Sequence, residues 1–331
     1  MKPVGTLLLT RHDVAALLTI EGCIAAVEHA FKLYGEGKTL PPGILGVHAR
    51  GGGFHIKAGL LELDRSYFAA KVNANFPENV KQFGLPMIQG VIVLCDGEHG
   101  YPLAVMDSIE ITIQRTGAAT AVAAKRLARS DSKTVTICGC GNQGRVSLRA
   151  LTRVLPIERV LAYDADEAQA RRFASELSEE LRINIEAVSD LENSVGQSGI
   201  CITCTPSKQP FLKRDFVAPG TFIAAVGADS PDKQELEPAL LSRSKIVVDV
   251  LEQCASIGEL HHALDAGLVT EHDVYAELGE VIAGVKPGRT TSDEIIIFDS
   301  TGMALQDVVT AAAVYEKAVN GGAGTRMNFA R

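Results

Sequence analysis

A glycine-rich turn between an apolar run and an amphipathic segment constrains this chain of 331 residues more than any other feature. The run 134–137 is rich in β-branched residues, and it leads into Gly139, Gly141 and Gly144 and then into the amphipathic segment 142–155. In dinucleotide-binding folds the first glycine of G-x-G-x-x-G permits the turn, the second lets the backbone approach a pyrophosphate, and the third lets helix and strand pack closely. The helix N-terminus adds free N–H groups for the phosphates. The stretch therefore predicts a dinucleotide site.

An acidic residue follows at the distance expected for a carboxylate that binds ribose. Asp164 ends a second apolar run, 159–163, and its separation from Gly139 is near the roughly 20 residues typical of this fold. A carboxylate there accepts hydrogen bonds from the adenosine 2′-OH and repels a 2′-phosphate. Because 164–166 contains no Arg or Lys, we expect NAD(H) rather than NADP(H). The alternative is that Asp164 is simply a solvated strand end.

Alternating strand and helix patterns continue after the glycine turn and predict an α/β fold with a Rossmann-type, doubly wound parallel sheet. Ligands of such sheets bind beyond the carboxyl ends of the strands. Further strands are expected at 184–188, 200–203, 222–226, 245–250 and 294–298, and helices at 167–181, 254–266, 271–282 and up to 319. The candidate cofactor residues are Thr116, Gly139, Gly141, Asn142, Gln143, Gly144, Asp164, Thr205, Pro206, Ser207, Val226, Gly227 and Ser300.

Two strands before the turn carry polar and cationic residues on one face. Strands are expected at 54–61, 68–75, 87–95 and 101–105, and helices at 10–18, 19–33 and 109–129. Side chains alternate along a strand, so His55 and Lys57 share one face of the first strand, and Lys71 and Asn73 share one face of the second. A solvated face and a row that contacts a ligand both explain this pattern. Arg115 begins a small-residue run in the long helix.

Composition excludes several classes of partner. The net charge is −8 without a basic tract, which argues against nucleic acid and acidic membrane surfaces. No apolar run reaches the length of a membrane span, and no signal peptide is expected. Seven cysteines without framework spacing fit a reducing cytoplasm, and Cys201 and Cys204 are expected as buried thiols within one strand. His261 and His262 are interpreted as a surface feature, and no metal site is expected.

Several motifs together resemble the ornithine cyclodeaminase/mu-crystallin family over nearly the whole chain. They are K-V-N-A-N-F-P from Lys71, G-L-P-M-I-Q-G from Gly84, Y-P-L-A-V-M-D from Tyr101, R-T-G-A-A-T-A from Arg115, the glycine turn, V-G-A-D-S-P-D-K-Q-E-L from Val226 and S-T-G-M-A-L-Q-D from Ser300. The resemblance implies a homodimer. It also implies an α+β substrate-binding and dimerisation domain, 1–128 plus 305–331, into which an NAD-binding Rossmann domain, 129–304, is inserted.

The same resemblance implies roles for particular residues. Lys71 and Arg115 are expected to hold the carboxylate of a small amino or imino acid. Asp229 is expected near the nicotinamide, where a carboxylate can manage protons on the substrate nitrogen. His55, Lys57 and Asn73 complete the predicted substrate residues, with Lys71, Arg115 and Asp229 as the catalytic group.

This chain departs from the family pattern at positions that bear on the reaction. Gly43 follows the Pro-Pro turn where cyclodeaminases carry an arginine, and Arg50 is a candidate to substitute for it. His55 stands where they carry a glutamate, and Lys57 where methionine is common. The more cationic wall argues against ornithine cyclisation and suits a substrate with additional negative charge or a different imine.

Three functions follow from these residues. The first is a cytoplasmic NAD(H)-dependent oxidoreductase that interconverts an L-amino acid and its 2-imino acid, as an imine reductase or an amino-acid dehydrogenase. The second is an ornithine cyclodeaminase that forms proline and ammonia with catalytic NAD. The third is a crystallin-like protein that binds the cofactor or a ligand without turnover.

Overall fold

The computed structural model describes residues 5–329, and the chain divides into two compact units. The first unit runs up to Arg115 and resumes at Met303, and the second unit is Thr116–Gly302. The first division lies within the long helix α4, Ile109–Leu127, rather than after it. No single helix among residues 5–329 is long and apolar enough to cross a bilayer. Among these residues one pair of helices, Arg11–Leu17 and Ile20–Gly35, meets the length and composition together, but it is bent by 86°.

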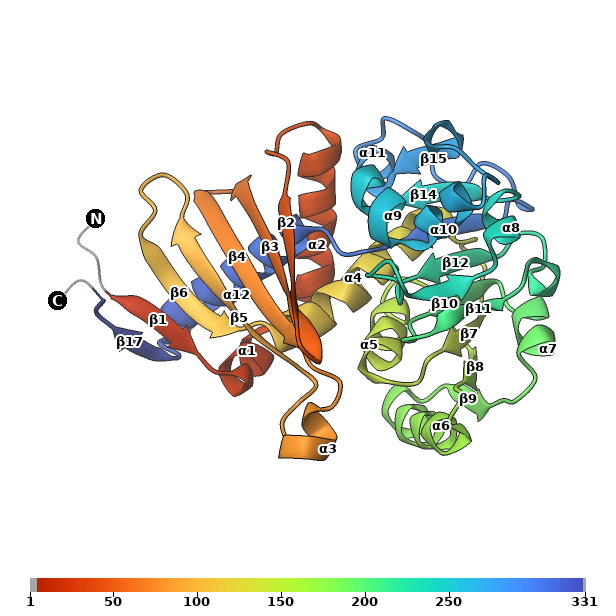
Figure 1. The fold of residues 1–331 in the computed structure, drawn as a ribbon, viewed down its shortest axis with the longest axis horizontal. Helices are drawn as coiled ribbons and strands as arrows, with labels where there is room; N and C mark the ends of the chain where they lie inside the picture. The colour runs from red at the N-terminus through yellow and green to blue at the C-terminus, as the bar shows by residue number, and fades with distance from the viewer. Residues whose placement is uncertain (1–4, 330–331) are drawn as a thin grey trace. The chain divides into compact units, whose positions relative to one another are not determined.

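The first unit is a seven-stranded sheet with helices on one face (Figure 1). Its strand order is β17-β1-β6-β5-β4-β3-β2. The strands are β1 Thr6–Leu9, β2 Gly43–Ala49, β3 Gly52–Glu62, β4 Ser66–Asn75, β5 Ile88–Asp96, β6 Pro102–Asp107 and β17 Thr325–Met327, and the helices are α1 Arg11–Leu17, α2 Ile20–Gly35, α3 Asn79–Phe83 and α12 Ala304–Gly321. Helix α12 packs on β3, β4 and α2. Gly59 permits this approach, because a Cβ there would lie 2.8 Å from Leu305 Cδ2.

The second unit contains the predicted parallel sheet, with the order β15-β14-β16-β12-β10-β7-β8-β9. All of its strand pairs are parallel, which confirms the doubly wound architecture. The strands are β7 Thr134–Cys138, β8 Arg159–Tyr163, β9 Asn184–Ala187, β10 Ile200–Thr203, β12 Phe222–Ala225, β14 Lys245–Val248, β15 Val274–Glu277 and β16 Ile296–Asp299. The helices are α5 Asn142–Leu151, α6 Glu167–Leu181, α7 Leu191–Gly196, α8 Pro238–Leu241, α9 Leu251–Ile257, α10 Glu259–Asp265 and α11 Leu278–Ile282, and a small sheet pairs β11 Lys208–Leu212 with β13 Gln234–Leu236.

Four local expectations are wrong. The helix expected at 254–266 is broken at Gly258, where the backbone is extended and Asp299 occupies the space that a Cβ would need. The helix expected at 271–282 contains β15, because that segment pairs with β14. Cys204 lies just beyond β10, and its thiol donates to Gly139 O at 3.2 Å. His261 and His262 are half-buried rather than surface residues, and His262 Nε2 lies 2.7 Å from Lys233 O.

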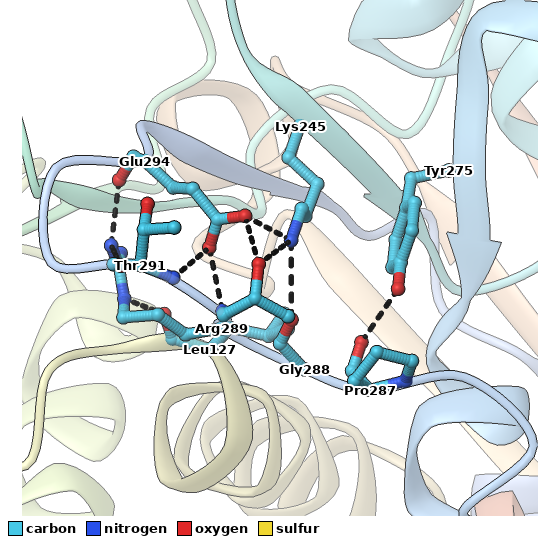
Figure 2. Close-up of polar contacts among 9 residues, drawn as sticks. Leu127, Lys245, Tyr275, Pro287, Gly288, Arg289, Thr291 and Glu294 are labelled. Atoms are coloured by element: carbon cyan, nitrogen blue, oxygen red, sulfur yellow. Dashed lines mark hydrogen bonds and ion pairs between the residues drawn. The ribbon is translucent and has the colours of Figure 1, made fainter.

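Within the second unit, the loop between α11 and β16 contacts the C-terminal end of α4 (Figure 2). Arg289 Nε donates to Leu127 O at 2.8 Å, at the C-terminus of the helix, where a cation also interacts favourably with the helix dipole. Lys245 forms an ion pair with Glu294 and lies 4.6 Å from the centroid of the Tyr275 ring. Tyr275 Oη donates to Pro287 O at 3.0 Å. These contacts hold the loop, and so they fix where α4 ends.

Candidate active site

The glycine turn has the geometry that a dinucleotide site requires. Gly139 has φ +102°, and a Cβ on Gly144 would lie 2.1 Å from Gly139 O, so neither position accepts a side chain. Gly141, the N-cap of α5, has open space around the position of a Cβ, which suits the approach of a phosphate. A Cβ on Gly117 would lie 2.9 Å from Val146, so the small-residue run of α4 packs closely on α5. The residues present therefore fit NAD(H).

Asp164 lies at the end of β8, and both of its oxygens are in use. Oδ2 accepts from Cys140 N at 2.8 Å, and Oδ1 accepts from Asp166 N at 2.9 Å. The first contact ties the carboxylate to the glycine turn, and the second orients it at the strand end. The side chain is thus fixed beside the turn, and it is not a loosely solvated terminus.

The other predicted cofactor residues follow neighbouring strands of the same sheet. Thr205, Pro206 and Ser207 come after β10, Val226 and Gly227 after β12, and Ser300 after β16, while Thr116 lies on α4 and Asn142 and Gln143 begin α5. Parallel strands bring these ends to one edge. Asp229 lies on the loop after β12, where Lys233 Nζ forms an ion pair with its Oδ1 at 2.6 Å.

A buried carboxyl group that the sequence analysis missed connects two of these loops. Glu235 of β13 is fully buried; its Oε1 accepts from Thr205 N at 2.6 Å, and its Oε2 accepts from Gly227 N at 3.0 Å. Burial raises the pKa of Glu235, although the hydrogen bonds that it accepts act in the opposite direction. The signal in the sequence was the acid near the end of the V-G-A-D-S-P-D-K-Q-E-L motif, six residues after Asp229.

The predicted polar row is present in the first unit. In the register of β3 with β4, Lys57 lies opposite Lys71, and His55 lies opposite Asn73. Lys71 is only 3% exposed, whereas His55 is exposed. Asn73 Oδ1 accepts from Ser108 Oγ at 2.6 Å. The row therefore runs from a buried cation at Lys71 outward to His55.

Asp307 holds Lys71 and Arg115 together, and the sequence analysis assigned it no role. Lys71 Nζ lies 2.7 Å from Asp307 Oδ2, and Arg115 Nε donates to Asp307 Oδ1 at 3.2 Å. Arg115 Nη1 also donates to Gln306 Oε1 at 3.0 Å. Asp307 lies in the first turn of α12, where the helix dipole favours a carboxylate. The two predicted carboxylate-binding residues are thus neighbours with a fixed orientation.

Burial and neighbouring charges determine the protonation of this cluster. Burial lowers the pKa of Lys71 to about 7; Asp307 opposes the shift, and the charges of Arg115 and Lys57 add to it. Burial alone would raise the pKa of Asp307, but Lys71 and Arg115 hold it below its ordinary value. Asp307 is therefore ionised at neutral pH, while Lys71 titrates near neutrality.

Arg50 lies away from the position of the missing arginine. Gly43 begins β2 and pairs with Ala58, whereas Arg50 lies in the turn beyond Ala49, at the opposite end of that strand. Lys57, which pairs with Ile44, is the cation nearest to Gly43 in the register of β2 and β3.

Together the sheet, the glycine turn and Asp164 define an NAD-binding oxidoreductase fold, and comparison with known proteins narrows the class. The chain belongs to the ornithine cyclodeaminase/mu-crystallin family, whose profile matches residues 4–322. It is an NAD(H)-dependent oxidoreductase of amino and imino acids.

Three relatives illustrate the similarity. The chain is 41% identical to alanine dehydrogenase of Archaeoglobus fulgidus over 327 residues, which cover 98% of this chain and 99% of the relative. The chain is 38% identical in sequence to Thermococcus litoralis Δ1-pyrroline-2-carboxylate reductase, whose structure contains NADH and L-proline. The two structures superpose with a TM-score of 0.92 over 97% of this chain and 100% of the reductase. The iminosuccinate reductase of Paracoccus denitrificans with NAD+ is 32% identical, with a TM-score of 0.89, covering 98% and 100%.

Proposed function

We propose that this chain reduces a 2-imino acid to an L-amino acid with NADH, or catalyses the reverse dehydrogenation, with Lys71 and Arg115 as the carboxylate anchor. The observation that carries the proposal is the buried cluster in which Asp307 orients both cations. Charge-assisted hydrogen bonds from two oriented cations suit a small carboxylate. Relatives named alanine dehydrogenase, Δ1-pyrroline-2-carboxylate reductase and iminosuccinate reductase support this class of reaction.

Each group of residues has a distinct part in the proposal. Lys71 and Arg115 bind the α-carboxylate, and Asn73 is available to the rest of the substrate. Asp229 holds or releases the proton on the substrate nitrogen, as general acid–base chemistry requires. NAD(H), when bound, supplies or accepts the hydride. The residues proposed to hold it are Thr116, Gly139, Gly141, Asn142, Gln143, Gly144, Asp164, Thr205, Pro206, Ser207, Val226, Gly227 and Ser300.

The row beyond Lys71 favours a substrate with further negative charge. Lys57 lies opposite Lys71, and its charge contributes to the lowered pKa of that lysine. A second carboxylate, or another electronegative group, would interact favourably with Lys57 and with His55 further along the strand. We therefore propose that the preferred substrate is an imine with a second negatively charged group rather than a simple aliphatic imine.

Lys57→Met tests this preference. Removing the cation should lower kcat/KM for a dicarboxylic imine about tenfold or more, since a charge-assisted hydrogen bond contributes roughly 1.5–3 kcal/mol. The value for a monocarboxylic imine should change less than about threefold, because Lys71 and Arg115 remain. Steady-state kinetics with oxaloacetate plus ammonia and with pyruvate plus ammonia measure both values. Equal losses on the two substrates would contradict a role for Lys57 in selectivity.

A screen of NADH oxidation tests the proposed function. Cyclic imines such as Δ1-pyrroline-2-carboxylate, and 2-oxo acids supplied with ammonia, should oxidise NADH in proportion to the amino acid formed. Proline and ammonia formed from ornithine without net NADH would instead establish a cyclodeaminase. If the protein binds NADH but turns over none of these substrates, the result would support the crystallin-like binding role.

The assembly we propose is a cytoplasmic homodimer formed through the first unit. The sheet face opposite Lys71 carries exposed apolar side chains on β2, β3 and β5, among them Leu45 (57% exposed), Val47 (45%), Phe54 (38%) and Val91 (43%). Monomeric proteins rarely leave such a patch in water. An archaeal alanine dehydrogenase, 40% identical with a TM-score of 0.93, is described as a dimer with bound NAD.

A further inference from the structure

Three carboxyl side chains are buried in succession within the second unit. Glu235 and Asp299 are fully buried, and Glu259 is 1% exposed. Glu235 lies on β13, Glu259 is the first residue of α10, and Asp299 is the last residue of β16. Burying a carboxyl group is costly unless it is hydrogen-bonded, so a series of three needs a structural reason.

Backbone N–H groups connect these carboxyl groups in order. Asp299 Oδ2 accepts from Leu260 N at 2.9 Å and so holds the start of α10. Glu259, the first residue of that helix, accepts from Glu235 N at 2.7 Å and from Leu236 N at 3.1 Å. The backbone of β13 is thereby fixed to α10, and the side chain of Glu235 projects from a fixed strand.

Glu235 differs from the other two because its partners are the predicted cofactor loops. Its Oε1 accepts from both the backbone N and the Oγ1 of Thr205, at 2.6 and 2.7 Å, and its Oε2 accepts from Gly227 N at 3.0 Å. Thr205 follows β10 and Gly227 follows β12, two neighbouring strands of the sheet. One carboxylate therefore sets the spacing between the two loops.

Gly227 is adapted to this arrangement. A Cβ at Gly227 would lie 2.4 Å from Glu235 Cδ, and the backbone of this glycine does not have a positive φ. Glycine is therefore required here because a side chain would collide with the carboxyl group of Glu235. It is not required by the backbone conformation. Asp229 follows two residues later on the same loop.

We propose that Glu235 is a positioning residue for the oxidoreductase reaction, because it fixes the Thr205 loop and the loop that carries Asp229 relative to each other. This inference rests on the proposed function, which gives those loops their cofactor and proton-handling roles. Glu235 acts through the two loops and touches neither substrate nor reacting atoms. Its loss should therefore reduce kcat and NADH affinity, and leave the carboxylate anchor of Lys71 and Arg115 unaffected.

Glu235→Gln is the direct test. The glutamine amide offers one acceptor and one donor where both loops supply N–H donors, so one loop loses its partner. We expect kcat to fall about tenfold or more and the Kd of NADH, measured from NADH fluorescence, to rise several-fold. The KM for the carboxylate substrate should stay within about threefold. Glu235→Asp, which keeps the charge but shortens the side chain, should show a smaller loss in the same direction and decides the question if the first variant does not fold.

Glu259→Gln is the matched control. It is equally buried and also meets two backbone donors, but these belong to β13 and not to the loops. We expect a comparable fall in Tm with losses of kcat and NADH affinity no larger than about threefold, because Glu259 reaches the loops only through β13 and the side chain of Glu235 remains in place. The proposal is overturned if folded Glu235 variants keep wild-type kcat and NADH affinity, or if Glu259→Gln loses as much of both as Glu235→Gln.

Failure of the proposed function would be visible separately. A wild-type protein that turns over no imine would refute the reaction, but the NADH titrations of the Glu235 and Glu259 variants would still decide the positioning role.

Discussion

Lys71 is a lysine whose charge depends on its burial. Its ammonium is shielded from water and faces Asp307 on one side, with the charges of Arg115 and Lys57 also near. Strand alternation and family resemblance predict Lys71 and Arg115 as site residues, but neither assigns a role to Asp307. That carboxylate is distant in sequence and becomes their partner only when α12 packs on β4, which no local pattern predicts.

The lowered pKa of Lys71 predicts a pH dependence. Burial lowers this pKa to about 7, so the ammonium proposed to bind the carboxylate is present below pH 7 and is lost as pH rises above it. We expect kcat/KM to decline with rising pH above about 7. Lys71→Arg keeps its charge throughout this range, so it should remove the decline. Lys71→Ala should lower kcat/KM more than tenfold at all pH values below 7, because the lost contact contributes about 1.5–3 kcal/mol. An alkaline decline that persists unchanged in Lys71→Arg would assign it to another group.

At the level of the elements, the long periodic segments were predictable and the short strands were not. The strand, turn and helix around Gly139 and the strands that carry Lys57 and Lys71 lie close to their expected bounds. By contrast, β1, β2, β17, β11 and β13 were not anticipated. Their stability comes from pairing with segments distant in the chain, or from hairpin pairing of a sequence interrupted by glycine, as in β2.

Asp164, directly after β8, is predicted to determine the preference for NADH over NADPH. Asp164 is tied to the glycine turn through Cys140 N, which places its charge where an adenosine ribose is expected. Asp164→Ala should weaken NADH binding and reduce the preference for NADH over NADPH by about tenfold. Kd values for both cofactors measure this ratio, with Asp166→Ala as the control. A wild type that prefers NADPH would contradict the role of Asp164.

At the scale of the whole molecule, the chain divides into two compact units. In the proposed function, the first unit supplies the cations oriented by Asp307 and the second supplies the nucleotide-binding edge. The family resemblance implies two domains, 1–128 plus 305–331 and 129–304, with the first boundary after α4. The compact units divide within α4 instead, since its small-residue half packs on α5. A pattern of small residues shows close packing, but it does not show against which element.

The exposed sheet face gives a prediction for assembly. Val47→Asp together with Val91→Asp should weaken the proposed dimer at least tenfold in Kd, because two charges would be transferred into an apolar interface. Light scattering coupled to gel filtration measures the mass across a dilution series. A double substitution on an exposed helix position, such as Glu179→Ala with Arg172→Ala, is the control. A wild type that is monomeric at all concentrations would contradict the proposed interface.

In the proposed reaction, hydride passes between NAD(H) and the carbon that bears the substrate nitrogen. Its most direct test is the reduction of Δ1-pyrroline-2-carboxylate, or of an oxo acid with ammonia, using NADH deuterated at the transferred position of C4. Mass spectrometry and NMR of the product should find one deuterium at Cα for each NADH oxidised. An amino acid without deuterium at Cα, or NADH oxidation without an amino acid product, would show that hydride does not pass from NADH to this carbon.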